Sequence, residues 1–507
     1  MRRHGALSKD LALKMFLICI SSAIAVAHCD FAAASSVSWV GPNNGEWDVA
    51  GNWSTGAVPI STDDVIDSLG NTSIVTNPAL QSISIGINSL TNNAGGTVLN
   101  EYGSSLAIYD GLDNSNSSQF ESNGMNDSNF TTSSDVAGSL DNNGAVIESI
   151  NGGDITMTGG TTSDAINDNG GVIEALGENT SYSSLLQVGN SGGVGGTNFV
   201  SLTNENNSTI EALSAGQLEV SAGSITNDAT SKIESSGSSN GGLHSNIFIY
   251  TGTSFTNMGM VMVSQGGSLS DTSSSQFTNG STGTLEVTDA NSSVGLSVSE
   301  LDNTGTIMVL NNGSLNINSD INQSAGLTKI SSNSTLSLTG YSAGPMNFNF
   351  NLNGGTLEGA NGTITGNVNQ NGGTFNSGLD PADFNISGNY TLSSGELSME
   401  VASLTSYDKL LVSGNTSISG GTLYLDFING FHPSSGETFD LITSTGGIAG
   451  GFTSVDSNLN GSYSFNNGIL TINGAPPVPE CGSTAAFLLL LAPVAALTVR
   501  KSRAASC

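Results

Sequence analysis

The sequence predicts an all-β protein: a right-handed parallel β-helix, or solenoid, between an N-terminal signal helix and a single C-terminal transmembrane helix. Three observations support this fold class. A short phrase recurs between Leu140 and Ile321, apolar and polar residues alternate within its copies, and helical apolar runs occur only at the two ends of the chain. Gly makes up 66 of the 507 residues and charged residues only 10%, a composition unlike that of an ordinary globular enzyme.

Residues 1–34 have the layout of a secretory signal peptide. Four basic residues precede an apolar run over 15–27, and small residues follow it. The run is shorter than the ~20 residues that cross a bilayer, which favours a cleaved signal over a membrane anchor. Cleavage after Ala27 and cleavage after Ala34 both fit. We expect the second, because the polar pattern of the mature chain begins at Ser35.

Residues 35–100 form the expected N-terminal capping module, which holds all three tryptophans of the chain, Trp39, Trp47 and Trp53. An uncapped solenoid exposes its apolar core and its strand edges, and aromatic rings bury a large apolar area per residue. One interpretation is therefore a cap over the first coil. The other is a glycan contact, in which the rings stack on sugars. Spaced Trp residues after a signal peptide resemble the opening of many large bacterial surface β-helices.

Residues 101–379 form the expected β-helix repeats. Each phrase opens with an apolar residue and small polar residues and continues as an alternating apolar run. Copies begin at Leu140, Ile166, Leu202, Ile225, Phe255, Phe277, Leu301 and Ile321. Successive copies start between 20 and 36 residues apart, which is the range of a solenoid coil. Alternation with period two predicts strands with one buried face, with Ile307 inward and Thr306 outward.

An Asn at the third position of the phrase predicts a polar stack along the rod. We expect this Asn at a turn, with left-handed backbone and with hydrogen bonds from coil to coil. The residues concerned are Asn142, Asn204, Asn227, Asn257, Asn279 and Asn303.

The phrase resembles the passenger repeats of autotransporter-type surface proteins, and residues 380–474, the expected C-terminal β module, extend this resemblance. Their strings YDKLLVSG (407–414), GGTLYLDF (420–427) and ETFDLI (437–442) are similar to the ending of many exported β-helix proteins. The membrane barrel that autotransporters use for their own secretion has no match in the sequence, because a different tail closes the chain. Self-secretion is therefore not expected.

Residues 475–507 resemble a PEP-CTERM sorting tail. Its parts are the motif Val478, Pro479 and Glu480, an apolar membrane helix over 485–499, and the basic residues Arg500, Lys501 and Arg503. Basic residues beyond the helix place that end in the cytoplasm. The resemblance implies a bacterial protein that an exosortase-type processing enzyme of the inner membrane recognises and that is secreted to the cell surface or the extracellular matrix. Cys481 departs from the family pattern, and a plain membrane anchor is the alternative.

The charge of the chain excludes several partners. Of the 42 acidic residues all but three lie between Ser35 and Ala475, with three of the ten basic residues, so this stretch has a net charge of -36. Nucleic acid is excluded because phosphate recognition needs clustered Lys and Arg. The stretch has no Cys and only His244 and His432, so zinc and copper lack ligands. No cofactor is predicted, and without a complete calcium loop only diffuse calcium binding is left.

The sequence predicts a non-catalytic structural or adhesion protein of the cell surface or the exopolysaccharide-containing matrix, with extracellular polysaccharide as its expected partner. The alternative is a polysaccharide-acting enzyme, a lyase or a glycoside hydrolase, on the same scaffold. A lyase base is commonly Arg or Lys, and the stretch between Ser35 and Ala475 has no Arg and three scattered Lys. The acid pair Asp63 and Asp64 has no His nearby in sequence and points to opposite faces of a strand. We therefore predict that the protein is not an enzyme.

Overall fold

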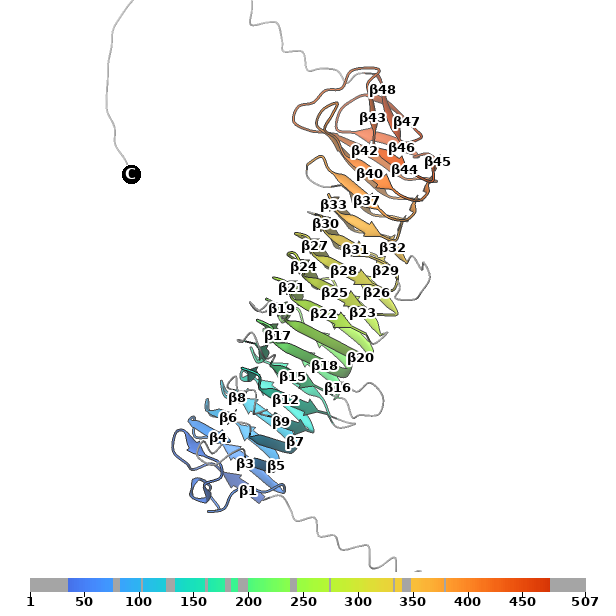
Figure 1. Cartoon of the computed structure of the whole chain (residues 1–507). Coiled ribbons are helices and arrows are strands. Elements are labelled where there is room, and N and C mark those ends of the chain that lie inside the picture. Colours follow the sequence, from blue (N-terminus) through green and yellow to red (C-terminus); the bar gives the residue numbers. More distant parts are fainter. Residues whose placement is uncertain are drawn as a thin grey trace, which may run out of the picture.

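The computed structural model describes residues 35–474 except 76–82, 102–103, 125–132, 160–162, 178–183, 190–198, 238–243, 273–274, 332, 340–347 and 378–379. These residues form a rod of stacked strands, with the first strands at one end and the last strands at the other (Figure 1). Three parallel ladders run along the rod, and the chain visits each of them in turn. The predicted all-β solenoid is confirmed.

Ladder 1 contains the strands that begin each repeat phrase. Its strands are β1 (Ser35–Ser38), β3 (Asp63–Asp67), β5 (Ser84–Asn92), β7 (Ser105–Ser115), β10 (Ser139–Asn143), β13 (Ala165–Asp168), β16 (Phe199–Asn204), β18 (Gln217–Asn227), β20 (Asn246–Asn257), β23 (Gln276–Asn279), β26 (Glu300–Asn303), β29 (Ile321–Gln323), β32 (Asn349–Leu352), β35 (Asn367–Gln370), β38 (Tyr390–Leu392), β41 (Thr416–Ile418) and β45 (Ile448–Gly450).

Ladder 2 contains the alternating strands that follow. They are β2 (Gly45–Glu46), β4 (Thr72–Val75), β6 (Thr97–Glu101), β8 (Gln119–Asn123), β11 (Val146–Ile150), β14 (Val172–Leu176), β17 (Thr209–Leu213), β19 (Lys232–Ser236), β21 (Met260–Ser264), β24 (Thr284–Thr288), β27 (Thr306–Leu310), β30 (Leu327–Ser331), β33 (Thr356–Ala360), β36 (Thr374–Asn376), β39 (Glu396–Val401), β42 (Thr422–Phe427) and β46 (Ser454–Ser457).

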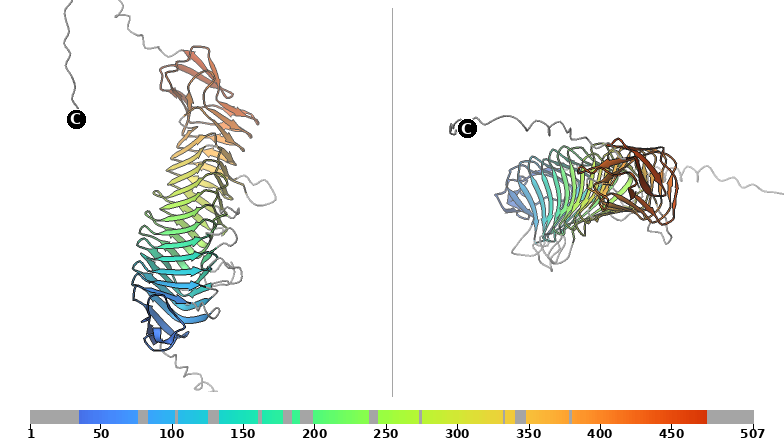
Figure 2. Two further views of the ribbon diagram at one scale, coloured as in Figure 1. Left: turned by 60° about the vertical axis from the view of Figure 1, so that its left-hand side comes forward. Right: turned by 90° about the horizontal axis from the view of Figure 1, so that it is seen from above.

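Ladder 3 completes each turn, and the long strands β5, β7, β18 and β20 pass from it into ladder 1. Its other strands are β9 (Ser133–Ala137), β12 (Asp154–Thr158), β15 (Leu185–Val188), β22 (Ser268–Asp271), β25 (Ser293–Leu296), β28 (Ser314–Ile317), β31 (Thr335–Ser337), β34 (Thr363–Thr365), β37 (Asp383–Ile386), β40 (Lys409–Val412) and β44 (Ile442–Ser444). Figure 2 shows from two further directions that successive turns stack along the whole rod.

The two ends of the rod depart from the parallel pattern. Near the N-terminus, the short 3-10 helix η1 (Ala50–Asn52) lies in a segment that folds back, so that Trp39 pairs with Trp53 in an antiparallel bridge. At the other end, β43 (Thr438–Asp440), β47 (Ser462–Asn466) and β48 (Ile469–Gly474) form a small antiparallel sheet. At both ends, these antiparallel segments interrupt the parallel stacking, so that a further parallel strand cannot simply pair with the last turn.

The core fills the space between the ladders, because every second residue of a strand points inward. In β27, Ile307 and Val309 are fully buried while Thr306 faces outward. Register places identical or similar side chains above one another, as with Phe255 and Phe277, whose ring centroids lie 4.8 Å apart at 73°. This edge-to-face geometry is a favourable one for aromatic pairs. The predicted alternation and register of this phrase are therefore confirmed.

The predicted asparagine stack exists, and its six residues are fully buried in ladder 1. The side-chain amides donate from Nδ2 to the next turn, for example from Asn204 to Oδ1 of Asn227 at 2.8 Å and from Asn227 to Oδ1 of Asn257 at 2.9 Å. Asn142 donates to Oδ1 of Asn167, and Asn303 donates to Oε1 of Gln323. The prediction of left-handed backbone at these positions is wrong, because the residues are still part of extended strands. Left-handed backbone occurs in turns instead, for example at Asn169 and Asn311.

The asparagine stack also explains why Gly recurs after it. A Cβ at Gly283 would lie 2.3 Å from the carbonyl oxygen of Asn257 and 2.5 Å from Oδ1 of Asn279. Such distances are shorter than real carbon–oxygen contacts, so only a residue without a Cβ lets the chain pass this close to the ladder.

The predicted signal helix and transmembrane helix lie in residues 1–34 and 475–507, outside the described residues. In the part of the chain that the structure describes, no helix has the length and apolar character needed to cross a bilayer. The three ladders run through residues 35–100 and 101–379 and continue into 380–474.

Substitution of Ile307 tests the register of the rod. Ile307→Asp would bury a carboxylate without a partner, which costs several kcal/mol, and we expect a loss of about 3 kcal/mol or more in the free energy of unfolding measured with urea. Thr306→Asp, on the outward face of the same strand, is the control and should change this free energy by less than about 0.5 kcal/mol. Equal effects of the two substitutions would contradict the assigned faces.

Candidate functional site

The three tryptophans form one buried cluster at the N-terminal end. Trp53 lies between the other two, with ring centroids 5.0 Å from Trp39 and 5.0 Å from Trp47, in edge-to-face contacts. The exposed fractions of Trp39, Trp47 and Trp53 are 1%, 0% and 2%. The ring nitrogen of Trp39 donates to Oδ1 of Asn71 at 3.1 Å. These rings have no open face on which a sugar could stack, so their geometry supports a cap.

The predicted sorting motif Val478, Pro479 and Glu480 and the basic residues Arg500, Lys501 and Arg503 lie outside the described residues. The last described strand, β48, ends at Gly474, directly before this tail.

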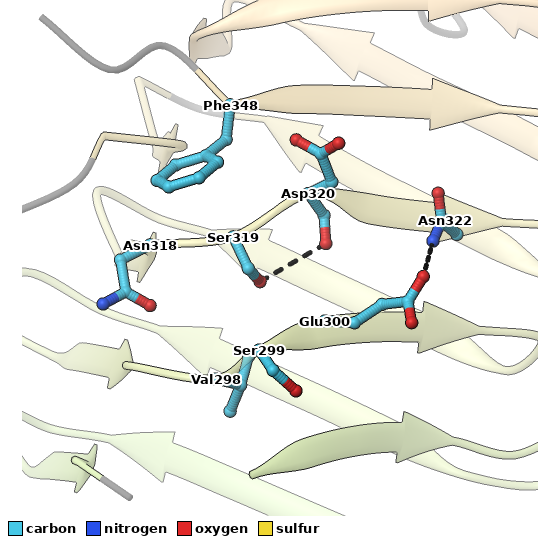
Figure 3. A pocket seen from close by; sticks show the side chains of 8 residues that line it. All are labelled: Val298, Ser299, Glu300, Asn318, Ser319, Asp320, Asn322 and Phe348. Atoms are coloured by element: carbon cyan, nitrogen blue, oxygen red, sulfur yellow. Dashed lines mark hydrogen bonds between the residues drawn. The ribbon is translucent and has the colours of Figure 1, made fainter. Parts of the chain in front are cut away.

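The candidate binding site is an open cavity of about 620 Å³ on the flank of the rod, where ladder 3 continues into ladder 1. Figure 3 shows Phe348 on one side of it, with Asp320, Asn322 and Glu300 on neighbouring turns. These residues precede or belong to β26, β29 and β32, which stack in register. The turns thus bring together residues that are far apart in sequence, and the sequence analysis did not identify this site.

Hydrogen bonds hold the two carboxylates of this cavity in place. Asn322 donates from Nδ2 to Glu300. Asp320 accepts from the backbone N–H of Asn349 at 2.8 Å and from its side-chain amide. Two outward amide columns continue from here, in which Asn351 donates to Asn322 at 2.9 Å and further amides follow. Each column directs its N–H groups toward a carboxylate, which fixes the orientation of that side chain.

The chemistry of the cavity fits a hydroxyl-rich, uncharged ligand. Carboxylate and amide oxygens accept hydrogen bonds from hydroxyl groups, and the partly buried ring of Phe348 offers an apolar surface. The described residues that line the cavity include no Lys, Arg or His, so an anionic ligand would meet two carboxylates there without a compensating cation.

A second group of acids lies near the C-terminal end, and the sequence analysis missed it. Glu400 in β39 lies directly beside Asp426 in β42. Burial raises the pKa of Glu400 to about 7, and the charges of Asp408, Asp426 and Asp380 add to this effect. Asp408 is fully buried and accepts from the backbone N–H groups of Ala382 at 2.8 Å and Glu400 at 2.6 Å. Only knowledge of the strand pairing could have revealed this group from the sequence.

The three lysines between Ser35 and Ala475 are all engaged. Lys232 forms an ion pair with Glu234, and Lys329 forms one with Glu358 at 2.5 Å. Lys409 lies 5.2 Å from the ring centroid of Tyr407, within the range of a cation–π contact.

Ladder 2 carries a column of glutamates on its outward face. They occupy matching positions of five successive strands, and they are Glu121, Glu148, Glu174, Glu211 and Glu234. Burial raises the pKa of Glu121 and of Glu211, and neighbouring glutamates raise it further. Among the described residues, no group of three or more His, Cys, Asp and Glu is arranged to hold a metal ion.

The comparisons with known proteins give no relative. No protein-family model matches the chain, and no curated protein sequence matches it.

The raised pKa of Glu400 predicts a pH dependence of stability. Between the ordinary value of 4.5 and about 7, the folded protein keeps a proton that the unfolded chain has lost, so stability falls as pH rises through this window. We expect Glu400→Gln to raise the Tm at pH 8 by about 1–3 °C and to leave it nearly unchanged at pH 4.5.

The matched control is Glu396→Gln on the same strand, which should shift the Tm equally at both pH values. A Glu400→Gln shift that is the same at pH 4.5 and pH 8 would show that this carboxyl has no raised pKa.

Proposed function

We propose that this protein is an exported, non-catalytic rod of the cell surface or extracellular matrix that binds neutral extracellular polysaccharide through its flank. The observation that carries the proposal is the cavity that Phe348, Glu300 and Asp320 line beside the outward amide columns. An aromatic ring beside hydrogen-bond acceptors suits sugar recognition, because a sugar has both apolar C–H faces and donating hydroxyl groups. A repetitive polymer also suits a surface whose side chains repeat every ~4.8 Å from turn to turn.

The proposed route to the surface uses both ends of the chain. A signal peptide over 1–34 directs export, and the tail over 475–507, with its helix over 485–499, is recognised by an exosortase-type enzyme in the inner membrane. The proposed hand of the solenoid is right-handed, as in nearly all connections between parallel strands.

One observation favours the enzymatic alternative, a glycoside hydrolase. Glu400 has a pKa of about 7 and lies beside Asp426, and two neighbouring carboxyl groups in different environments can divide the roles of general acid and base. Against this assignment, the nearby carboxylate of Asp408 accepts hydrogen bonds from the backbone N–H groups of Ala382 and Glu400. The acid group thus has a structural role in holding the backbone. We therefore favour binding without catalysis.

The glycan-binding test uses protein recovered from the extracellular fraction of producing cells. It is passed over immobilised neutral and acidic polysaccharides, with retention and release of reducing ends scored separately. We expect retention on a neutral polysaccharide, and a loss of at least about tenfold in affinity, or ~1.4 kcal/mol, for Phe348→Ala.

Tyr109→Ala is the matched aromatic control, because Tyr109 is 55% exposed and lies in β7, outside the cavity. It should bind like the wild type, and all variants are compared by Tm. Release of reducing ends that Glu400→Gln abolishes would establish the enzymatic alternative. Retention on acidic polysaccharides alone would contradict the proposed ligand.

The sorting proposal predicts that the extracellular form ends near Pro479 to Cys481. Replacing Pro479 and Glu480 with Ala should leave the full-length chain in the inner membrane, because the processing enzyme loses its motif. Mass spectrometry of the C-terminal peptide checks both statements. A secreted protein that still contains Arg500 would reject processing at this position.

A further inference from the structure

The buried asparagine ladder has a direction. It begins at Asn92, whose Nδ2 donates to Oδ1 of Asn114 at 3.0 Å, and the next bond runs from Asn114 to Asn142 at 3.1 Å. The series continues in the same sense to Asn303, which donates to Gln323 at 3.2 Å. Every N–H therefore points toward the C-terminal end, and the side-chain oxygen of Asn92 is left as the acceptor at the N-terminal end.

Backbone carbonyls fix this direction. Nδ2 of Asn92 also donates to the carbonyl oxygen of Gln119 at 3.0 Å, and Nδ2 of Asn114 donates to that of Val146 at 2.8 Å. Rotating the amide of Asn92 by half a turn would bring its Oδ1 against two acceptor oxygens. The oxygen of Asn92 must therefore face the preceding turn.

The preceding turn places Asp67 at this position. Asp67 pairs in register with Asn92, and the exposed fractions of the two residues are 1% and 0%. Ser73 donates from Oγ to Oδ2 of Asp67 at 2.7 Å. Neither Oδ1 of Asp67 nor Oδ1 of Asn92 receives a hydrogen bond from the residues that the structure describes. Two acceptors without a proton, stacked in a buried ladder, repel each other and lose their hydration.

We propose that Asp67 keeps its proton in the folded protein and donates it to Oδ1 of Asn92, so that the N-terminal end of the ladder is a proton-binding site and a pH-sensitive element of the rod. One proton satisfies both oxygens. It also continues the direction of the ladder by one turn, with a carboxylic acid in the place of an amide.

The charged surroundings support this assignment. Strand β3 has several neighbouring strands. Among them, β1, β4 and β5 carry no titratable side chain, and β2 carries Glu46, which faces outward. On β3 itself, Asp63 accepts from Ser35 and from the backbone N–H of Ile60, and Asp64 faces outward. Burial raises the pKa of Asp67, although hydrogen bonds from Ser73 and the backbone of Leu69 lower it. No cation of the described residues lies among these groups to hold Asp67 as an anion.

The sign of the pH effect follows. Above the ordinary value of 3.8, the unfolded chain loses the Asp67 proton while the folded protein retains it, so the N-terminal end loses stability as pH rises toward the higher folded pKa. Asp67→Asn supplies an N–H donor at every pH. It should therefore be more stable than the wild type at pH 8, and the difference should vanish near pH 4.

The test follows thermal unfolding by Trp emission, because all three tryptophans lie in the N-terminal cap and report on this end of the rod. For Asp67→Asn we expect a Tm at least about 2 °C above that of the wild type at pH 8, and no difference at pH 4. Glu46→Gln removes a charge from the same end without touching the ladder, and its Tm difference should not change with pH. The infrared difference spectrum of wild type minus Asp67→Asn at pH 7 should also contain the C=O band of a buried carboxylic acid, because the half-protonated Glu400 contributes equally to both proteins.

Two results would overturn the proposal. One is a wild type and an Asp67→Asn variant with parallel pH profiles and no carboxylic acid band in their difference spectrum at pH 7. The other is an Asp67→Asn variant that is folded by circular dichroism but less stable than the wild type at pH 8, since this would show that the site requires the ionised carboxylate. Neither outcome depends on glycan binding or on tail processing.

Discussion

The rod depends on one constraint: a buried polar side chain between ladder 1 and ladder 2 must find its hydrogen bonds in the neighbouring turns. An isolated Asn at this depth would leave donors and acceptors without partners, which costs several kcal/mol. In register, Asn167 donates to Asn204 at 2.8 Å and to the carbonyl of Thr209 at 3.0 Å. A shift of one residue between turns would break both bonds at once, so the ladder fixes the register of the stack.

The same stacking produces opposite electrostatic results inside and outside the rod. Inside, aligned amides reinforce one another because each bond polarises the next. Outside, stacking in register brings like charges together, as in the glutamate column of ladder 2, where Lys232 is the cation beside Glu234. The outward amide columns avoid this repulsion by ending on single carboxylates, Glu300 and Asp320. The positions of the amide side chains thus determine which outward carboxylates of this acidic solenoid receive hydrogen bonds.

The candidate binding cavity is a product of the turns. Phe348, Asp320 and Glu300 belong to three successive turns, and none of the three belongs to a recognisable sequence motif. The tryptophans show the reverse case, since they lie within fifteen residues of sequence and are the three tryptophans of the chain, yet they are buried as an end cap. Sequence prominence and accessibility to a ligand are therefore separate properties in this protein.

The sequence by itself determined the solenoid, the buried face of strands such as β27, and the existence of an asparagine stack, because period-two alternation and a recurring phrase are local signals. It placed the asparagines in left-handed turns, whereas they are extended, since only the paired strands show where a strand ends. The pairing of Glu400 with Asp426, the cavity at Phe348 and the pairing of Asp67 with Asn92 were decided by the tertiary structure alone. The number of residues between equivalent positions of successive turns varies with loop length. The local sequence pattern therefore contains no information about which residues the stacking brings into register.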